Sequence, residues 1–270
     1  MPVVRAGEID INYRIAGDGT ETVMLVNGLG DDLDAWAPQV DDFVDAGLRL
    51  VTFDNRGVGA SSHPRGPYTS RQMAQDAKAL AAVLGLPPFH LAGVSMGGVI
   101  AQEYAVAYPG DLRSVILANT YSVADPFTAA AFNSWGLVAE TAGMAVMTQQ
   151  MAPWIYSPDF YEREPEKVAA LLVEMMKTTQ PAESFLAQTA ALVNHDCSAR
   201  VGAIETPALV IAASDDIIIR PALSRRLHAA LPRATWVEVP GGHAAFWENP
   251  RPWNQAVIEF VRTQSATTLT

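Results

Sequence analysis

Residues 91–98 read "LAGVSMGG", an apolar run that ends on a serine between very small neighbours. The residues before Ser95 have the continuous apolar character of a strand buried on both faces. The segment 97–110 has helical periodicity and closes at a Pro-Gly pair. The chain must therefore turn from strand to helix at Ser95. Gly93 and Gly97 suit that turn because side chains at these positions would collide across it.

The rest of the chain repeats this alternation of strand and helix. Near-continuous apolar runs lie at 22–28, 48–54, 89–94 and 112–120, and strand patterns return from Thr206 and over 234–240. Helical patterns lie at 70–86 and 97–110, from Pro221, and in a last segment that ends near Arg262. This order predicts an α/β fold with a mostly parallel sheet flanked by helices. The polar tail 263–270 is expected to be frayed.

Residues 121–201 break the alternation, because they contain helix-like stretches without clear strand signals. We expect one α/β core, residues 1–120 and 202–270, interrupted by an inserted helical cap. Methionines and tryptophans are frequent in this segment and could line a flexible apolar pocket. The residues expected to face the serine are Trp36, Trp135, Met147, Trp154 and Tyr156.

Composition excludes several classes of protein. A net charge of −11 argues against nucleic acid and anionic membranes as partners. The single cysteine, Cys197, allows no disulfide within the chain, and the histidines lack metal-ligand spacing, so neither metal nor cofactor is expected. With no signal peptide or membrane-spanning run in the sequence, a cytoplasmic protein is expected. Whether it forms a homo-oligomer is left open.

A serine needs a base to become a nucleophile, and one histidine has the right position. His243 lies in "VPGGHAAFWENP", directly after the last expected strand. The stretch "ALVIAASDDIIIRP" places Asp215 and Asp216 at the end of another strand, between the serine and the histidine in sequence. Parallel strands end at one edge of a sheet, so these groups should meet there. Spacing alone does not choose between the two aspartates.

Two backbone N–H groups are candidates for an oxyanion hole. One belongs to Met96, which follows the serine, and the other to Leu29 in the loop "VNGLGDDLDAW". Glycines on both sides of Leu29 allow the backbone to approach a substrate. Together with Ser95, His243 and an aspartate, these groups predict acyl transfer at the end of the sheet.

The motifs "NGLG…W", "FDNRGVGAS" (53–61), "GVSMGG", "SDD" and "GGH" resemble the α/β-hydrolase superfamily over nearly the whole chain. "NGLGDDLDAWAPQV" and "VILANT" resemble 3-oxoadipate enol-lactonases. "GVSMGG" equally resembles cofactor-free bromoperoxidase-like esterases, and "ASDDIIIRP" resembles aminoacrylate hydrolase. The resemblance implies Ser95 as nucleophile, His243 as base and Asp216 as acid, with Leu29 and Met96 at the oxyanion hole.

One departure from the enol-lactonase pattern bears on the substrate. Pro153–Trp154 stands where those lactonases have an Arg-Trp pair, so an obvious partner for a substrate carboxylate is missing. We therefore expect a serine hydrolase for a small, mainly apolar carboxylic ester or lactone. The alternatives are a cofactor-free perhydrolase or haloperoxidase, a lyase or cyclase on the same scaffold, and a non-catalytic ligand-binding protein.

Overall fold

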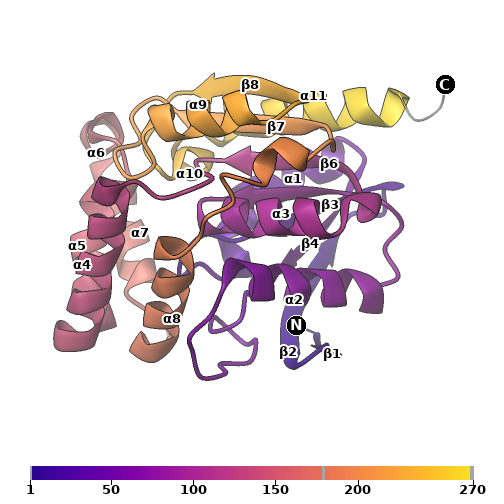
Figure 1. Cartoon of the computed structure of the whole chain (residues 1–270). Helices are drawn as coiled ribbons and strands as arrows, with labels where there is room; N and C mark the ends of the chain where they lie inside the picture. The colour runs from indigo at the N-terminus through magenta and orange to yellow at the C-terminus, as the bar shows by residue number, and fades with distance from the viewer. Residues whose placement is uncertain (1, 178–179, 268–270) are drawn as a thin grey trace.

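The computed structural model describes residues 2–177 and 180–267 (Figure 1). Its strands are β1 (Val3–Ala6), β2 (Ile9–Ala16), β3 (Glu21–Val26), β4 (Leu48–Phe53), β5 (Phe89–Val94), β6 (Leu112–Ala118), β7 (Ala208–Ala213) and β8 (Ala234–Val239). The helices that flank them are α1 (Ala37–Asp45), α2 (Ser70–Val83), α3 (Met96–Ala107), α9 (Pro221–Ala230), α10 (Ala245–Glu248) and α11 (Pro250–Thr267). Three short 3-10 helices are η1 (Leu33–Trp36), η2 (Pro109–Asp111) and η3 (Val201–Ala203).

Within the described residues, the strands form one eight-stranded sheet in the order β1-β2-β4-β3-β5-β6-β7-β8. The pairs from β4 to β8 are all parallel, which confirms the predicted mostly parallel α/β sheet. β1 and β2 are antiparallel and were not predicted from the sequence. Both carry several exposed or half-buried residues, so they lack the continuous apolar run that marks the inner strands.

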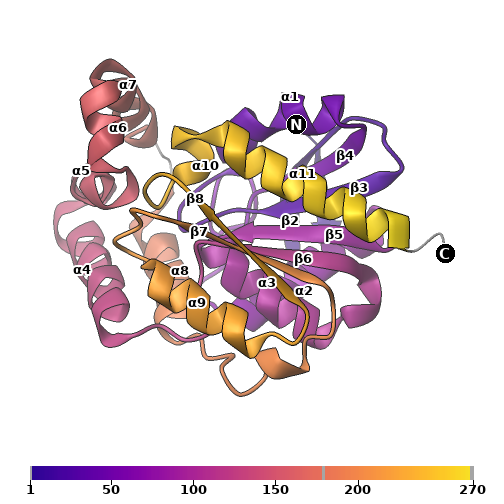
Figure 2. The same ribbon diagram turned by 90° about the horizontal axis from the view of Figure 1, so that it is seen from above.

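Helices cover both faces of the sheet. α1 and α11 lie on one face, and α2, α3 and α9 lie on the other (Figure 2). The first face is closed by aromatic packing, in which the ring of Trp253 lies 5.8 Å from that of Trp36 and 6.3 Å from that of Phe43. The fully buried strand β5 runs between these two layers, so its carboxyl end is fixed from both sides.

In the described part of the chain, five α-helices are inserted between β6 and β7: α4 (Pro126–Ala142), α5 (Met144–Ile155), α6 (Pro158–Arg163), α7 (Pro165–Met175) and α8 (Ala182–Val193). They gather at one end of the sheet, beside the α/β layers (Figures 1 and 2). A bridge between Val123 and Asp196 joins the start of this insertion to its end. The Cys197 N–H donates to the Ser122 carbonyl at 2.8 Å beside it. The inserted helices therefore leave and re-enter the core at one point.

The last helix is longer than the sequence pattern indicates. α11 continues to Thr267, beyond the expected end near Arg262, and residues 268–270 of the tail lie outside the described residues. No helix in the described part of the chain is both long enough and apolar enough to span a membrane.

Candidate active site

Ser95 occupies the sharp turn between β5 and α3. Its backbone angles, φ 54° and ψ −114°, are ones that residues with side chains rarely adopt. The Ser95 N–H donates to the Ala118 carbonyl (2.9 Å), and Thr120 Oγ1 donates to the Ser95 carbonyl (3.0 Å). A Cβ on Gly93 would lie 2.1 Å from the carbonyl oxygen of Gly97. The turn therefore requires glycine there, as the sequence predicts.

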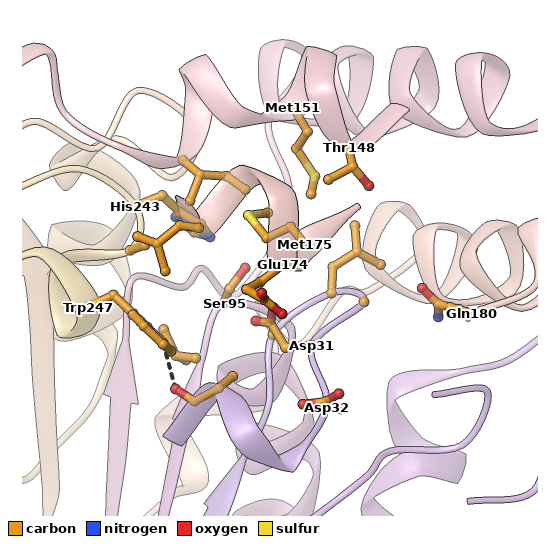
Figure 3. A pocket seen from close by; sticks show the side chains of 18 of the residues that line it. Asp31, Asp32, Ser95, Thr148, Met151, Glu174, Met175, Gln180, His243 and Trp247 are labelled. Atoms are coloured by element: carbon orange, nitrogen blue, oxygen red, sulfur yellow. Dashed lines mark hydrogen bonds between the residues drawn. The ribbon is translucent and has the colours of Figure 1, made fainter. Parts of the chain in front are cut away.

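His243 lies in the loop after β8 and points into the same cavity as Ser95 (Figure 3). Its Nδ1 is 2.7 Å from Oδ2 of Asp216, in the loop after β7. Asp215 instead has an exposed side chain, and its carboxylate accepts a hydrogen bond from Ser214 Oγ at 2.7 Å. The backbone geometry thus brings Asp216 to the imidazole and turns its neighbour to solvent.

The Asp216 carboxylate is buried and fully engaged. Oδ1 accepts hydrogen bonds from the N–H groups of Ile218 (2.9 Å) and Ile219 (2.8 Å). Oδ2 accepts from Asn119 Nδ2 at 2.9 Å in addition to facing His243. Four donors around one carboxylate fix its orientation.

The electrostatics of His243 reflect this pair. Burial of the imidazole lowers its pKa, but the charge of Asp216, its hydrogen bond and the nearby Asp31 outweigh burial and raise the pKa above its ordinary value. The imidazole is therefore a stronger base than an isolated histidine.

The loop after β3 brings Leu29 to the cavity. Asn27 Nδ2 donates to the Asp31 carbonyl (3.1 Å) and to the Phe53 carbonyl (3.0 Å), which fixes the shape of the loop. Gly30 has φ 77° and donates its N–H to Gln188 Oε1 of α8 at 3.2 Å. Leu29 lies on the cavity wall next to Ser95. Among the described residues, its N–H makes no hydrogen bond.

Met96 supplies the second candidate N–H. It is the first residue of α3, so its N–H has no partner within the helix. Its side chain is fully buried, and it directly follows Ser95, which lines the cavity. The two residues predicted for an oxyanion hole thus both follow strands that end at the same edge of the sheet.

The cavity has a volume of about 590 Å³, within the usual range for small-molecule sites. Its wall is mainly apolar and is formed largely by the inserted helices, with Met144, Met147, Met151, Met175, Phe132 and Trp135. Its charged residues besides His243 are Asp31, Asp32, Asp34, Glu174 and Lys177. Lys177 pairs with Glu174 at 2.5 Å, so acidic groups predominate around the opening.

Three of the five residues predicted for the pocket line this cavity, namely Trp135, Met147 and Tyr156. Trp154 does not line it. Its ring packs edge-on against Trp135 with 6.1 Å between centroids, so it supports the wall from behind. The sequence pattern cannot separate these two positions, because both lie on amphipathic helices of the same insertion.

Trp36 also lies away from the cavity, in the core. Only 1% of its surface is exposed, and its ring packs against Phe246 at 5.3 Å between centroids. η1 turns its side chain toward the face of the sheet that α11 covers. Trp247 lines the cavity near this place instead, held by a hydrogen bond from its Nε1 to the Ala35 carbonyl at 2.6 Å (Figure 3).

Glu248 joins the histidine loop to the insertion. Its Oε1 accepts from the N–H groups of Ser157 (2.7 Å) and Gly242 (3.0 Å), and its Oε2 accepts from Ser157 Oγ (2.7 Å). A Cβ on Gly242 would lie 2.6 Å from the Ser157 nitrogen. The position of His243 therefore depends on contacts with the inserted helices as well as on the core.

Comparison with known proteins assigns the chain to a family. A family model described as "Serine aminopeptidase, S33" matches residues 18–243. The chain is an α/β hydrolase. It is 31% identical to "Putative carbamate hydrolase RutD" of Caulobacter segnis over 262 residues, covering 94% of this chain and 98% of that one. It is 30% identical to "3-oxoadipate enol-lactonase 2" of Acinetobacter baylyi, covering 93% of each.

A solved structure agrees with the sequence comparison. The enol-lactonase from Burkholderia xenovorans LB400 superposes on this α/β hydrolase with a TM-score of 0.90 at 28% identity, covering 97% of this chain and all of that one. The family assignment makes this chain a hydrolase enzyme and confirms the predicted superfamily and fold.

Three residues at or near the site of this hydrolase are not identified by the sequence pattern. Asn119 follows β6 with a positive φ of 47°, and only the fold shows that it faces Asp216. Glu248 lies in a segment that reads as an ordinary helix start. Asp31 belongs to an acidic pair that looks like a solvated loop, yet its carboxyl group lines the cavity.

Proposed function

We propose that this hydrolase cleaves a small, mainly apolar carboxylic ester or lactone through the triad Ser95, His243 and Asp216. The observation that carries the proposal is that a strained serine shares one mainly apolar cavity with a histidine whose Nδ1 faces a buried aspartate. Each group comes from the carboxyl end of a different strand. A binding protein would have no need of this arrangement.

Acylation follows from the positions of these groups. Ser95 Oγ attacks the carbonyl carbon of the substrate while His243 Nε2 takes its proton. The Asp216 carboxylate accepts the hydrogen bond from Nδ1, which keeps the other ring nitrogen free to act as base. The N–H groups of Leu29 and Met96 stabilise the negative oxygen of the tetrahedral intermediate. The intermediate collapses as the imidazolium protonates the leaving alcohol, or the opened lactone oxygen.

Deacylation repeats these steps with water. His243 removes a proton from water, which attacks the acyl-enzyme, and the acid leaves as Ser95 recovers its proton. The positive dipole at the start of α3 favours the negative charge that forms beside it. No metal enters the scheme.

The inserted helices determine substrate choice in this proposal, acting as a cap. They supply the methionine and aromatic wall, which suits an apolar acyl or alcohol group. The arginines near the loop after β4 are engaged elsewhere. Arg56 forms a buried pair with Asp76 at 2.5 Å, and Arg71 faces Glu103 at 3.6 Å. Neither arginine lines the cavity, so neither is placed to bind a substrate dianion there, which argues against an oxoadipate-type substrate.

The test is a time course with p-nitrophenyl acetate and p-nitrophenyl butyrate, comparing the native enzyme with Ser95→Ala. A burst of about one nitrophenol per enzyme followed by turnover, absent in the variant, is expected from an acyl-enzyme. Mass spectrometry after a fluorophosphonate should find Ser95 modified. Equal slow release by both proteins would refute the triad proposal.

A further inference from the structure

The cavity holds a carboxyl group that the triad does not use. Asp31 Oδ2 lies 2.7 Å from the point where a Cβ on Gly28 would stand, and that point is 3.8 Å from Ser95 Cβ. Asp31 is therefore next to the nucleophile, as Figure 3 shows. Its main-chain oxygen accepts a hydrogen bond from Asn27, but its carboxyl group forms none with any residue in 2–177 or 180–267.

The charged and titratable groups around Asp31 come from four elements. Asp32 follows it in the same loop. Glu174 lies on α7 and pairs with Lys177 just after that helix. Tyr156 directly follows α5, and His243 comes from the loop after β8. Lys177 Nζ donates a hydrogen bond to Glu174, and His243 Nδ1 faces Asp216. Apart from His243, whose Nδ1 faces Asp216, the described cavity wall thus places no unpaired cation near Asp31.

Burial and the neighbouring Asp32 raise the pKa of Asp31 to about 7, while His243 opposes the rise. The carboxyl group therefore gains its charge near neutral pH. Once charged, it has no hydrogen-bond donor of the protein to face, so it gains most from a cationic group on a bound molecule.

We propose that Asp31 is a specificity-determining residue, which selects esters carrying an ammonium group near the scissile carbonyl. The inference rests on the proposed serine hydrolase reaction and narrows its substrate class. The ammonium group lies against the carboxylate of Asp31, while the apolar remainder of the substrate occupies the methionine-rich wall. The same charge disfavours a substrate with a second carboxylate at this point.

The experiment compares esters that differ only in charge. One pair is 2-(trimethylammonio)ethyl butanoate and 3,3-dimethylbutyl butanoate, with the cation on the alcohol side. The other is methyl 4-(trimethylammonio)butanoate and methyl 5,5-dimethylhexanoate, with the cation on the acyl side. Acid release is followed with a pH-stat, and the ratio of kcat/KM for charged over neutral ester is the readout. Because these ammonium groups are permanently charged, pH alters only the protein.

In the native enzyme, the ratio of kcat/KM for charged over neutral ester should exceed one for at least one pair of esters. Asp31→Asn should lower this ratio about tenfold, because a partly solvated pair of charges keeps only part of its Coulomb energy. The neutral esters should change less than about threefold. Asp31→Glu should retain the preference. The matched control is Asp34→Asn, which removes an equal charge from the same cavity wall and whose ion-pair partner, Arg14, does not line the cavity; its ratio should stay within about twofold.

The ratio in the native enzyme should also rise between about pH 6 and pH 8 and stay flat in Asp31→Asn. A ratio unaltered by Asp31→Asn would overturn the proposal, as would an equal loss in Asp34→Asn, which would assign the effect to the general acidity of the cavity wall. If no ester is cleaved and Ser95 is not labelled by a fluorophosphonate, the proposed function itself fails. Turnover without charge selection refutes the role of Asp31 alone.

Discussion

Replacing Asp216 by asparagine tests the triad most directly. Oδ1 of Asp216 accepts two main-chain N–H groups, from Ile218 and Ile219, so the amide oxygen of Asp216→Asn must stay on that side. The amide NH₂ then replaces Oδ2 and faces two other donors, Asn119 Nδ2 and the N–H of His243. The imidazole must move its proton to Nε2 to accept there, which is the wrong tautomer for taking the serine proton.

The structure sets the size of the effect. Recovering the right tautomer requires the amide to flip, which leaves the N–H groups of Ile218 and Ile219 facing a donor. Each unpaired buried donor costs about 1–3 kcal/mol, so the flipped state lies about 2–6 kcal/mol higher. At about 1.4 kcal/mol per tenfold, kcat/KM should fall between about 30-fold and about 2 × 10⁴-fold. The loss of a charge-assisted bond to Asn119 should also lower the free energy of unfolding by about 1–3 kcal/mol.

The assay is the pH dependence of kcat/KM for p-nitrophenyl butyrate, with circular dichroism as a check on folding. The active imidazole is neutral, so the native rate falls as pH drops through the raised pKa of His243. Without the charge of Asp216, burial dominates and lowers the pKa of His243. The pH below which kcat/KM declines should therefore be lower in Asp216→Asn than in the native enzyme. Asp215→Asn is the matched control and should stay within about twofold, since its side chain is exposed. A folded Asp216→Asn enzyme with more than a tenth of native activity would refute the reasoning.

Two further predictions concern residues that support the site, and a third concerns a buried histidine elsewhere in the fold. Gly93→Ala should lower the free energy of unfolding by at least about 3 kcal/mol and abolish esterase activity, because its Cβ would lie 2.1 Å from a backbone oxygen; a native denaturation midpoint in urea would contradict this. Glu248→Ala removes three hydrogen bonds from a buried carboxylate, so we expect about 3–5 kcal/mol less stability and a lower kcat, whereas Glu248→Gln should recover part of both. Burial lowers the pKa of His195 to about 4, so its neutral form stabilises the fold above about pH 6.5 and that contribution is lost as pH falls toward 4. The free energy of unfolding, measured with urea, should therefore fall by roughly 3 kcal/mol less between about pH 6.5 and pH 4 in His195→Gln than in the native protein. The same fall in both proteins would exclude this role.

The turn at Ser95 could be predicted from sequence because its causes are local. An apolar strand, glycines at fixed offsets and a helical pattern all lie within a few residues, and each is forced by the geometry of one turn. His243 was predictable for a similar reason, since a loop that follows a strand of a parallel sheet must open at the same edge. Strand positions in the core followed from continuous apolar runs.

The choice between residues of the same type depends on the direction in which each side chain points in the folded chain. No local sequence pattern predicts that direction. Asp215 and Asp216 are equivalent in spacing, and only the loop after β7 turns one toward His243. Trp36 and Trp135 look alike in sequence, but one packs under α11 and the other lines the cavity.

The sequence by itself determined the α/β alternation and the strand-to-helix turn, because these depend on residues that are neighbours in the chain. It also indicated the serine, the aspartate pair and the histidine, because each directly follows an apolar strand pattern. Only the tertiary structure decided that Asn119 holds Asp216, that Glu248 ties the histidine loop to the insertion, and that Asp31 lies beside Ser95. These contacts join segments that are distant in sequence or depend on the direction in which a loop turns. Their energies arise only when the strands bring those segments to one edge of the sheet.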